Sequence, residues 1–302
     1  MAAHLIAETD IIDVSSLSML IYGAPGVGKT YLAQTAADPI TLDIDKGAHR
    51  AANRKAVMRF DKFADLADAS VEIAKRKTII VDTIGRLLDL LSADIIEKNA
   101  KHGSAVGGLT LQGFGALKAR FAQWVNQLRL QGKDLVFICH EKEEKDGDDR
   151  IMRPDIQGGS YTEVMKFTDL VGYLYVDRQG RRSLDFNPSD RHLGKNAAQW
   201  QSMPVVQGTA DMLGNLFADA KRIIGHTAEA SASIARAVDD WTARLDADPT
   251  LIELNDMLPE LSKLGTSAKS QVWAIILERA TKYELTFDKA SKKFVAPEGA
   301  VV

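Results

Sequence analysis

The stretch YGAPGVGKTY (residues 22–31) decides the fold of this chain. It follows the short apolar run 17–21, which is typical of a buried strand. It leads into residues 31–36, whose pattern indicates a helix. Glycines and a proline between a strand and a helix predict a tightly curled loop.

The glycines, the lysine and the threonine of this loop match the pattern G-x-x-x-x-G-K-[ST]. Such a loop curls so that backbone N–H groups point at a phosphate, and the following helix adds partial positive charge. Lys29 is expected to reach the β- and γ-phosphates, and the Thr30 hydroxyl to coordinate Mg²⁺. The predicted cofactors are therefore ATP and Mg²⁺. The residues expected to contact the nucleotide are Gly23, Ala24, Pro25, Gly26, Val27, Gly28, Lys29, Thr30 and Tyr31.

A phosphate-binding loop of this kind requires an acidic residue at the end of a second strand. The run TIIVD (residues 78–82) supplies one, because a β-branched segment ends there in Asp82. At the carboxyl edge of a parallel sheet, Asp82 would hold the Mg²⁺ together with Thr30.

Strand-like and helix-like segments alternate through the first two thirds of the chain. The pattern predicts strands at 17–22, 39–44, 56–60, 77–82, 134–139, 170–176 and 182–186, and helices at 29–37, 62–76, 84–98 and 112–131. This alternation predicts an α/β fold with a mainly parallel sheet covered by helices on both faces. We assign this ATPase domain to residues 1–226.

The remainder of the chain, residues 227–302, is predicted to form a small, mostly helical domain. A helix ending near Gly225 precedes it, and further helical patterns cover 234–245, 251–263 and 267–283. The closing stretch YELTFDKASKKFV is consistent with a hairpin.

Composition limits the function classes. The formal net charge is −3, so contact with nucleic acid requires a local basic patch. The single cysteine excludes a disulfide within the chain. No apolar run has the length of a membrane span, and residues 1–13 lack the pattern of a signal peptide. These features predict a cytoplasmic protein, located in the bacterial host if the gene is carried by a phage.

The order of the motifs resembles the RecA-like core, specifically the compact ATPases of phage recombination modules that promote single-strand annealing. The resemblance covers roughly residues 16–200. It implies DNA-stimulated ATP hydrolysis, single-stranded DNA as the partner, and a homo-oligomer in the form of a ring or filament. It also suggests a single-strand-binding protein as a partner.

The resemblance assigns two further catalytic roles. TLDIDKG places Asp43 and Asp45 where the family has its water-orienting acid, and Asp45 is the predicted general base, although it could instead open the turn before Gly47. DLVFICH places His140 where the family has a polar sensor of the γ-phosphate, and a histidine packed at a strand end is the alternative.

The same resemblance locates DNA contacts and trans-acting cations. It implies a first DNA loop within 101–115 and a second after His140, although the acidic tract 141–149 departs from the pattern because it repels a DNA backbone. Arg191 and Lys195 correspond to residues that reach a neighbouring subunit's ATP. Local basic clusters are further hypotheses for DNA contact: His49, Arg50, Arg54, Lys55 and Arg59; Arg178, Arg181 and Arg182; and Lys98, Lys101 and His102.

Two other classes of protein use the same loop. A small-molecule kinase needs an arginine-rich lid, which DRQGRR could imitate only between two strands. A motor or loader that acts in DNA replication is the alternative, because GAPGVGKT is closer to the loops of AAA-type ATPases. No arginine-bearing helical lid follows the core in the sequence to support that class.

Overall fold

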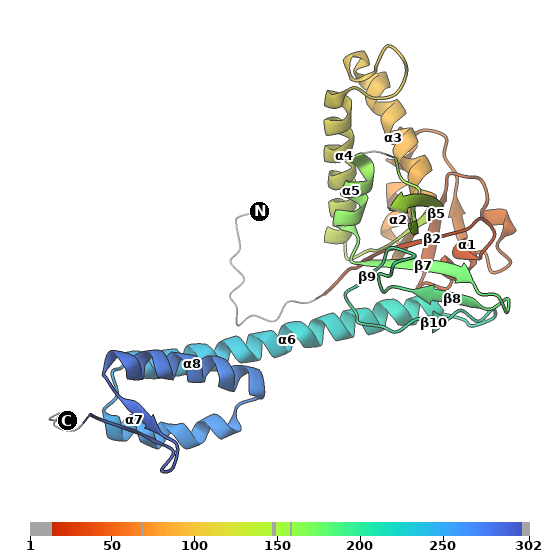
Figure 1. The fold of residues 1–302 in the computed structure, drawn as a ribbon. Helices are drawn as coiled ribbons and strands as arrows, with labels where there is room; N and C mark the ends of the chain where they lie inside the picture. Colours follow the sequence, from red (N-terminus) through yellow and green to blue (C-terminus); the bar gives the residue numbers. More distant parts are fainter. Residues whose placement is uncertain (1–13, 68, 147–148, 158, 298–302) are drawn as a thin grey trace. The chain divides into compact units, whose positions relative to one another are not determined.

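The computed structural model describes residues 14–297 except 68, 147–148 and 158, so the N-terminal segment considered above lies outside the described residues (Figure 1). The chain divides into two compact units, one of them Val14–Ile224 and the other beginning at Gly225. Within the described ranges, no helix combines the length and the apolar character needed to cross a bilayer.

A ten-stranded sheet forms the centre of the first unit, and its main path runs β10-β8-β7-β1-β5-β4-β2-β3. Its six strands from β7 to β3 are parallel, which confirms the predicted α/β fold with a mainly parallel sheet. The strands are β1 (Ser18–Gly23), β2 (Pro39–Asp43), β3 (Ala56–Met58), β4 (Thr78–Asp82), β5 (Asp134–Asp146), β6 (Asp149–Pro154), β7 (Leu170–Val176), β8 (Arg182–Asp185), β9 (Lys195–Asn196) and β10 (Met203–Pro204).

Helices cover both faces of this sheet because side chains alternate along its central strands. In β1, Leu20 and Tyr22 face one core, whereas Met19 and Ile21 face the other. The first core is covered by α2 (Ser70–Ala74), α3 (Ile84–Lys98), α4 (Leu111–Leu130) and α5 (Gly159–Phe167). The second is covered by α1 (Lys29–Ala33) and by the part of α6 (Met212–Asp246) before Gly225.

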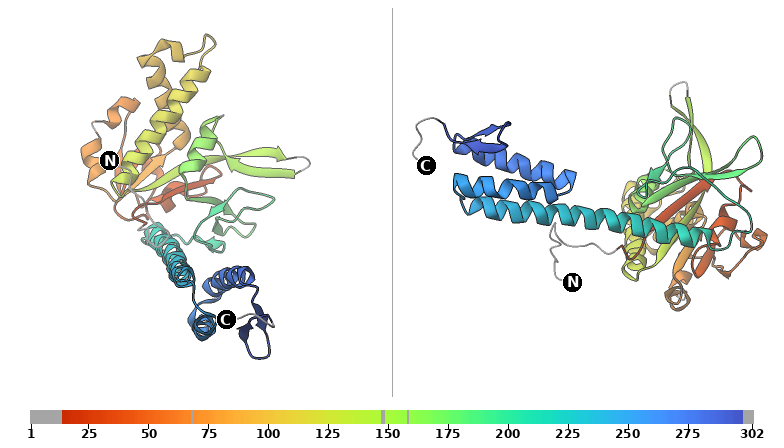
Figure 2. Two further views of the ribbon diagram at one scale, coloured as in Figure 1. Left: turned by 90° about the vertical axis from the view of Figure 1, so that its left-hand side faces the viewer. Right: turned by 90° about the horizontal axis from the view of Figure 1, so that it is seen from below.

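Several segments of the first unit differ from the sequence-based expectations. The helix expected over 29–37 is only α1, and the one expected over 62–76 is divided into a 3₁₀ turn, η2 (Phe63–Leu66), and α2. Strand β5 continues past Cys139 and forms a hairpin with β6 (Figure 2). Cross-strand ion pairs hold this hairpin, Arg150 to Glu143 at 3.1 Å and Arg153 to Glu144 at 3.3 Å.

The second unit is mainly helical. Helix α6 continues through Gly225, so the helix end expected at this glycine is wrong. The unit also contains α7 (Leu251–Met257), the 3₁₀ turn η4 (Leu258–Lys263) and α8 (Thr266–Lys282). The predicted closing hairpin is present as β11 (Thr286–Asp288) and β12 (Lys293–Val295). Trp241, Val272, Ile276 and Phe294 belong to its buried core.

Candidate functional site

The ends of four parallel strands bring the predicted site residues to one edge of the sheet. Strand β5 lies between β1 and β4, and its residue His140 pairs with Gly23, where the loop begins. On the other side, Asp82 pairs with Ile138, and Asp45 follows β2 by two residues. Parallel strands end at a common edge, so residues distant in the sequence meet there.

The loop has the curled backbone that its glycines predict. Gly26 and Gly28 have φ values of 78° and 106°, in the left-handed region that favours glycine. At Gly23 a Cβ atom would lie 2.1 Å from the Leu174 carbonyl oxygen, so no other residue fits. The close packing of the loop against Leu174 of β7 therefore requires a glycine at position 23.

Lys29 is buried inside this loop. Its Nζ donates to the carbonyl oxygens of Gly23 at 2.7 Å and Ala24 at 2.8 Å. Burial lowers the pKa of Lys29, and the nearby Asp82 carboxylate opposes that shift. An ammonium group held over a loop by two weak acceptors is available to a stronger anionic acceptor such as a phosphate oxygen.

The main chain of the loop fits a phosphate group. Among the described residues, the backbone N–H groups of Gly26, Gly28, Lys29 and Thr30 donate to no protein acceptor, and the first helical bond is Leu32 N to the Gly28 oxygen at 2.9 Å. Unpaired donors of this kind form an anion-binding concavity. Because α1 has only five residues, we expect these amides and Lys29 to attract a phosphate more strongly than the dipole of the helix does.

Thr30 and Asp82 form the oxygen pair predicted to coordinate Mg²⁺. The Thr30 hydroxyl donates to Asp82 Oδ2 at 2.7 Å, and Asp82 is buried. Burial raises the pKa of Asp82, against the hydrogen bond from Thr30. The described residues contain no group of three or more His, Cys, Asp or Glu side chains that could hold a metal. Mg²⁺ suits such a sparse site, because it keeps several waters and phosphate oxygens as ligands.

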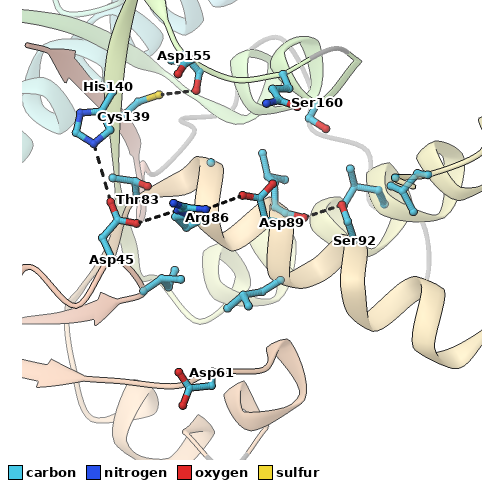
Figure 3. Close-up of a pocket in the computed structure, with 18 of the residues that line it drawn as sticks. Asp45, Asp61, Thr83, Arg86, Asp89, Ser92, Cys139, His140, Asp155 and Ser160 are labelled. Carbon is cyan, nitrogen blue, oxygen red and sulfur yellow. Dashed lines mark hydrogen bonds and ion pairs between the residues drawn. The ribbon is translucent and has the colours of Figure 1, made fainter. Parts of the chain in front are cut away.

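Asp45 lies between the side chains of Arg86 and His140 (Figure 3). Its Oδ1 is 3.6 Å from Arg86 Nε, and its Oδ2 is 4.0 Å from His140 Nε2. Its backbone N–H donates to the Asp82 carbonyl oxygen at 3.2 Å, which fixes the segment against β4. The side chain is 27% exposed, so water can reach the carboxylate.

Asp43, two residues earlier, has a different role. It is fully buried and accepts hydrogen bonds from the N–H groups of Gly47 and Ala48 at 2.8 and 3.0 Å. Arg59 Nε lies 3.1 Å from its other oxygen. Asp43 therefore closes the turn before Gly47, and the alternative considered for Asp45 describes Asp43 instead.

A pocket of about 960 Å³ extends from this site. Asp45 and His140 line it beside Arg86 and Asp89 of α3 (Figure 3). Leu109, from the connection between α3 and α4, also lines it. The pocket thus joins the predicted base and sensor to the first predicted DNA loop.

Two arginines of the site were not identified from the sequence. Arg86, in the first turn of α3, contacts Asp45 and also lies 3.6 Å from Asp89. Its position directly after the Asp82 strand was the available signal. Arg182, considered above only as part of a basic cluster, donates from Nε to the Val27 carbonyl oxygen in the loop at 2.9 Å. No sequence pattern predicts the contact between Arg182 and Val27, because the two residues are far apart along the chain.

The remaining predicted residues, Tyr31, Lys195 and Arg191, make contacts within their own chain. The Tyr31 hydroxyl accepts from the Gly208 N–H at 2.7 Å, which ties the start of α1 to the segment before α6. Lys195 donates to the Thr168 carbonyl oxygen within its own chain. Arg191 is exposed, and its carbonyl oxygen accepts from Met152 N–H.

These features define a P-loop ATP-binding domain. The chain belongs to the AAA domain family (AAA_24), whose model matches residues 15–198, more than half of the chain. No curated protein matches it.

Proposed function

We propose that this protein is an Mg²⁺-dependent ATPase that acts on single-stranded DNA in annealing or strand exchange, as phage recombination ATPases do. The observation that carries the ATPase is the Thr30–Asp82 contact of 2.7 Å beside the buried Lys29. When bound, Mg²⁺ would neutralise charge on the transferring phosphoryl group.

Each side chain of the site has a distinct task in this proposal. Lys29 exchanges its two carbonyl acceptors for phosphate oxygens and so holds the substrate in place. Asp45 accepts a proton from the attacking water. Arg86 and His140, on either side of Asp45, orient its two oxygens.

Asp45→Asn tests the proposed base. We expect ATP turnover to fall by about a hundredfold, because general-base catalysis typically contributes at least that factor. The ATP dissociation constant should change less than twofold, since no binding role is assigned to Asp45. Asp61→Asn is the matched control, because Asp61 lines the same pocket and is exposed beside Lys46. Unchanged turnover in Asp45→Asn would remove it as the base.

The DNA part of the proposal is supported by the exposed turn between α3 and α4. Val106 is 97% exposed there, and Leu111, the first residue of α4, is 89% exposed. The Ser104 N–H donates to the Gly108 carbonyl oxygen at 3.0 Å, so the turn is internally held. Exposed apolar side chains can pack against unstacked bases, and Lys101 provides a nearby cation for the backbone.

Several of the basic residues considered for DNA contact are engaged within the chain. Arg59 pairs with Asp43, Lys98 with Asp94 and Arg181 with Asp177. This leaves the turn at 103–109 as the better supported contact.

We propose a homo-oligomer in which Arg191 reaches the neighbouring nucleotide, because the Lys195 ammonium already donates to the Thr168 carbonyl.

Single-stranded DNA is expected to raise ATP turnover, and Val106→Asp to weaken DNA binding about tenfold, the scale of one lost base contact. Fluorescence anisotropy with a labelled oligonucleotide measures the affinity. Val71→Asp is the control, since Val71 is 64% exposed on α2.

The family match also fits a motor or loader in DNA replication. Stimulation by forked duplex but not by single strands would favour that function and contradict annealing.

A further inference from the structure

Strand β8 delivers an arginine to the outer side of the phosphate-binding loop. Arg182, its first residue, donates from Nε to the Val27 carbonyl oxygen at 2.9 Å. The Arg182 carbonyl oxygen accepts from the Val205 N–H at 2.9 Å, so its backbone is held by the neighbouring segment. Strand β7, which pairs with both β1 and β8, sets the distance between this arginine and the loop.

The turn before β8 engages the side chain of Arg181 but not that of Arg182. Asp177 accepts from the N–H groups of Gln179 and Arg181, both at 2.9 Å, and pairs with the Arg181 side chain at 2.7 Å. Arg181 is thereby used in closing the turn. Among the described residues, Arg182 forms no ion pair with a carboxylate, whereas Arg181 pairs with Asp177.

The Arg182 side chain lies close to Gly28. A Cβ atom at Gly28 would lie 3.4 Å from Arg182 Nε and 3.7 Å from its Cδ, which are ordinary van der Waals distances. The left-handed φ of 106° is therefore what requires a glycine here, and the arginine packs beside it.

The hydrogen bond to Val27 controls the next amide of the loop. In a trans peptide, the C=O and the following N–H point in opposite directions. An arginine that fixes the Val27 oxygen from outside thus fixes the direction of the Gly28 N–H, which donates to no acceptor in the described chain. A charge-assisted bond also polarises the peptide and strengthens that N–H as a donor.

We propose that Arg182 is a positioning residue of the phosphate site, which braces the Val27–Gly28 peptide within its own subunit and adds a positive charge on the side of that peptide opposite the bound nucleotide. This inference rests on the proposed ATP binding. It reassigns Arg182 from the DNA-contacting cluster to the nucleotide site.

Direct binding of ATP, ADP and adenosine to the full chain tests the brace. We expect Arg182→Gln to weaken ATP and ADP about tenfold, the effect of losing one charge-assisted contact. Binding of adenosine, which lacks phosphates, should be unchanged. Arg181→Gln is the control and should stay within twofold of the wild type. The melting temperature of the nucleotide-free variants shows whether each one folds.

The outcomes separate this inference from the proposed function. A wild type that binds no ATP contradicts the proposed function itself. A wild type that binds, with Arg182→Gln equally tight or Arg181→Gln equally weakened, contradicts the brace alone. Should Arg182→Gln not fold, Arg182→Lys decides, since an ammonium group cannot reproduce the Nε geometry. An ATP affinity at least threefold weaker then supports the brace, and an unchanged affinity overturns it.

Discussion

Lys29→Ala is expected to lower ATP turnover by about a thousandfold, the upper range for removing one preorganised donor from a transition state. The ammonium lies between the carbonyl oxygens of Gly23 and Ala24, in the curve of the loop where the amides are unpaired. Removing it leaves the amides without the only lysine that the loop contains. Turnover assays at saturating ATP, together with titrations of binding, measure the change.

The folded state should tolerate this substitution. Burial lowers the pKa of Lys29, which means that its charge is held in an unfavourable environment. The nucleotide-free variant should therefore melt at or above the wild-type temperature. Lys46→Ala is the control, because Lys46 lines the adjoining pocket and pairs with Asp61 at 2.7 Å. Turnover in Lys29→Ala similar to that of Lys46→Ala would show that the loop does not bind the reacting nucleotide.

Asp82→Asn should abolish Mg²⁺-dependent turnover and stabilise the nucleotide-free protein. The asparagine keeps an acceptor for the Thr30 hydroxyl but removes the charge that a divalent ion requires. A loss of about a hundredfold or more is expected, as for other electrostatic contacts to a transferring group. Turnover measured across a range of Mg²⁺ concentrations gives the first result, and thermal unfolding gives the second.

The pH dependence of stability provides an independent check on Asp82. Burial raises its folded-state pKa above the unfolded value, so the native state binds this proton more tightly. The ionised Asp82 carboxylate therefore lowers the free energy of unfolding at any pH above its folded-state pKa. This penalty shrinks as the pH falls below that pKa toward the ordinary carboxyl range. Asp82→Asn should lose this pH-dependent part and be the more stable protein at neutral pH. A lower melting temperature at pH 7 would contradict the account.

The sequence predicted the parts of the site that depend on local chemistry. The loop from Gly23 to Thr30 requires particular residue types at fixed spacing, and the apolar run ending in Asp82 signals a strand end. Because strands of an α/β sheet end at a common edge, placing these motifs on strands also predicted that they meet. The mainly parallel sheet follows from the same alternation.

The parts that escaped prediction depend on contacts between distant segments. The contact of Arg182 with Val27 requires a particular packing of β7 beside β1, which no local pattern encodes. Asp43 and Asp45 are both acidic and two residues apart, yet one is fully buried under three donors and the other reaches solvent. Cross-strand ion pairs hold β5 and β6 in a hairpin over the acidic tract, where the resemblance implied a second DNA loop.

Calorimetric titration of the wild-type chain with ATP, with and without Mg²⁺, tests the central claim most directly. The account predicts saturable binding of one nucleotide per chain, with a dissociation constant between about 1 μM and 1 mM, the usual range of substrate affinities. Binding should be tighter when Mg²⁺ is present. The absence of saturable heat at millimolar ATP would contradict the assignment of the loop as a nucleotide site, and with it every role assigned to the residues around it.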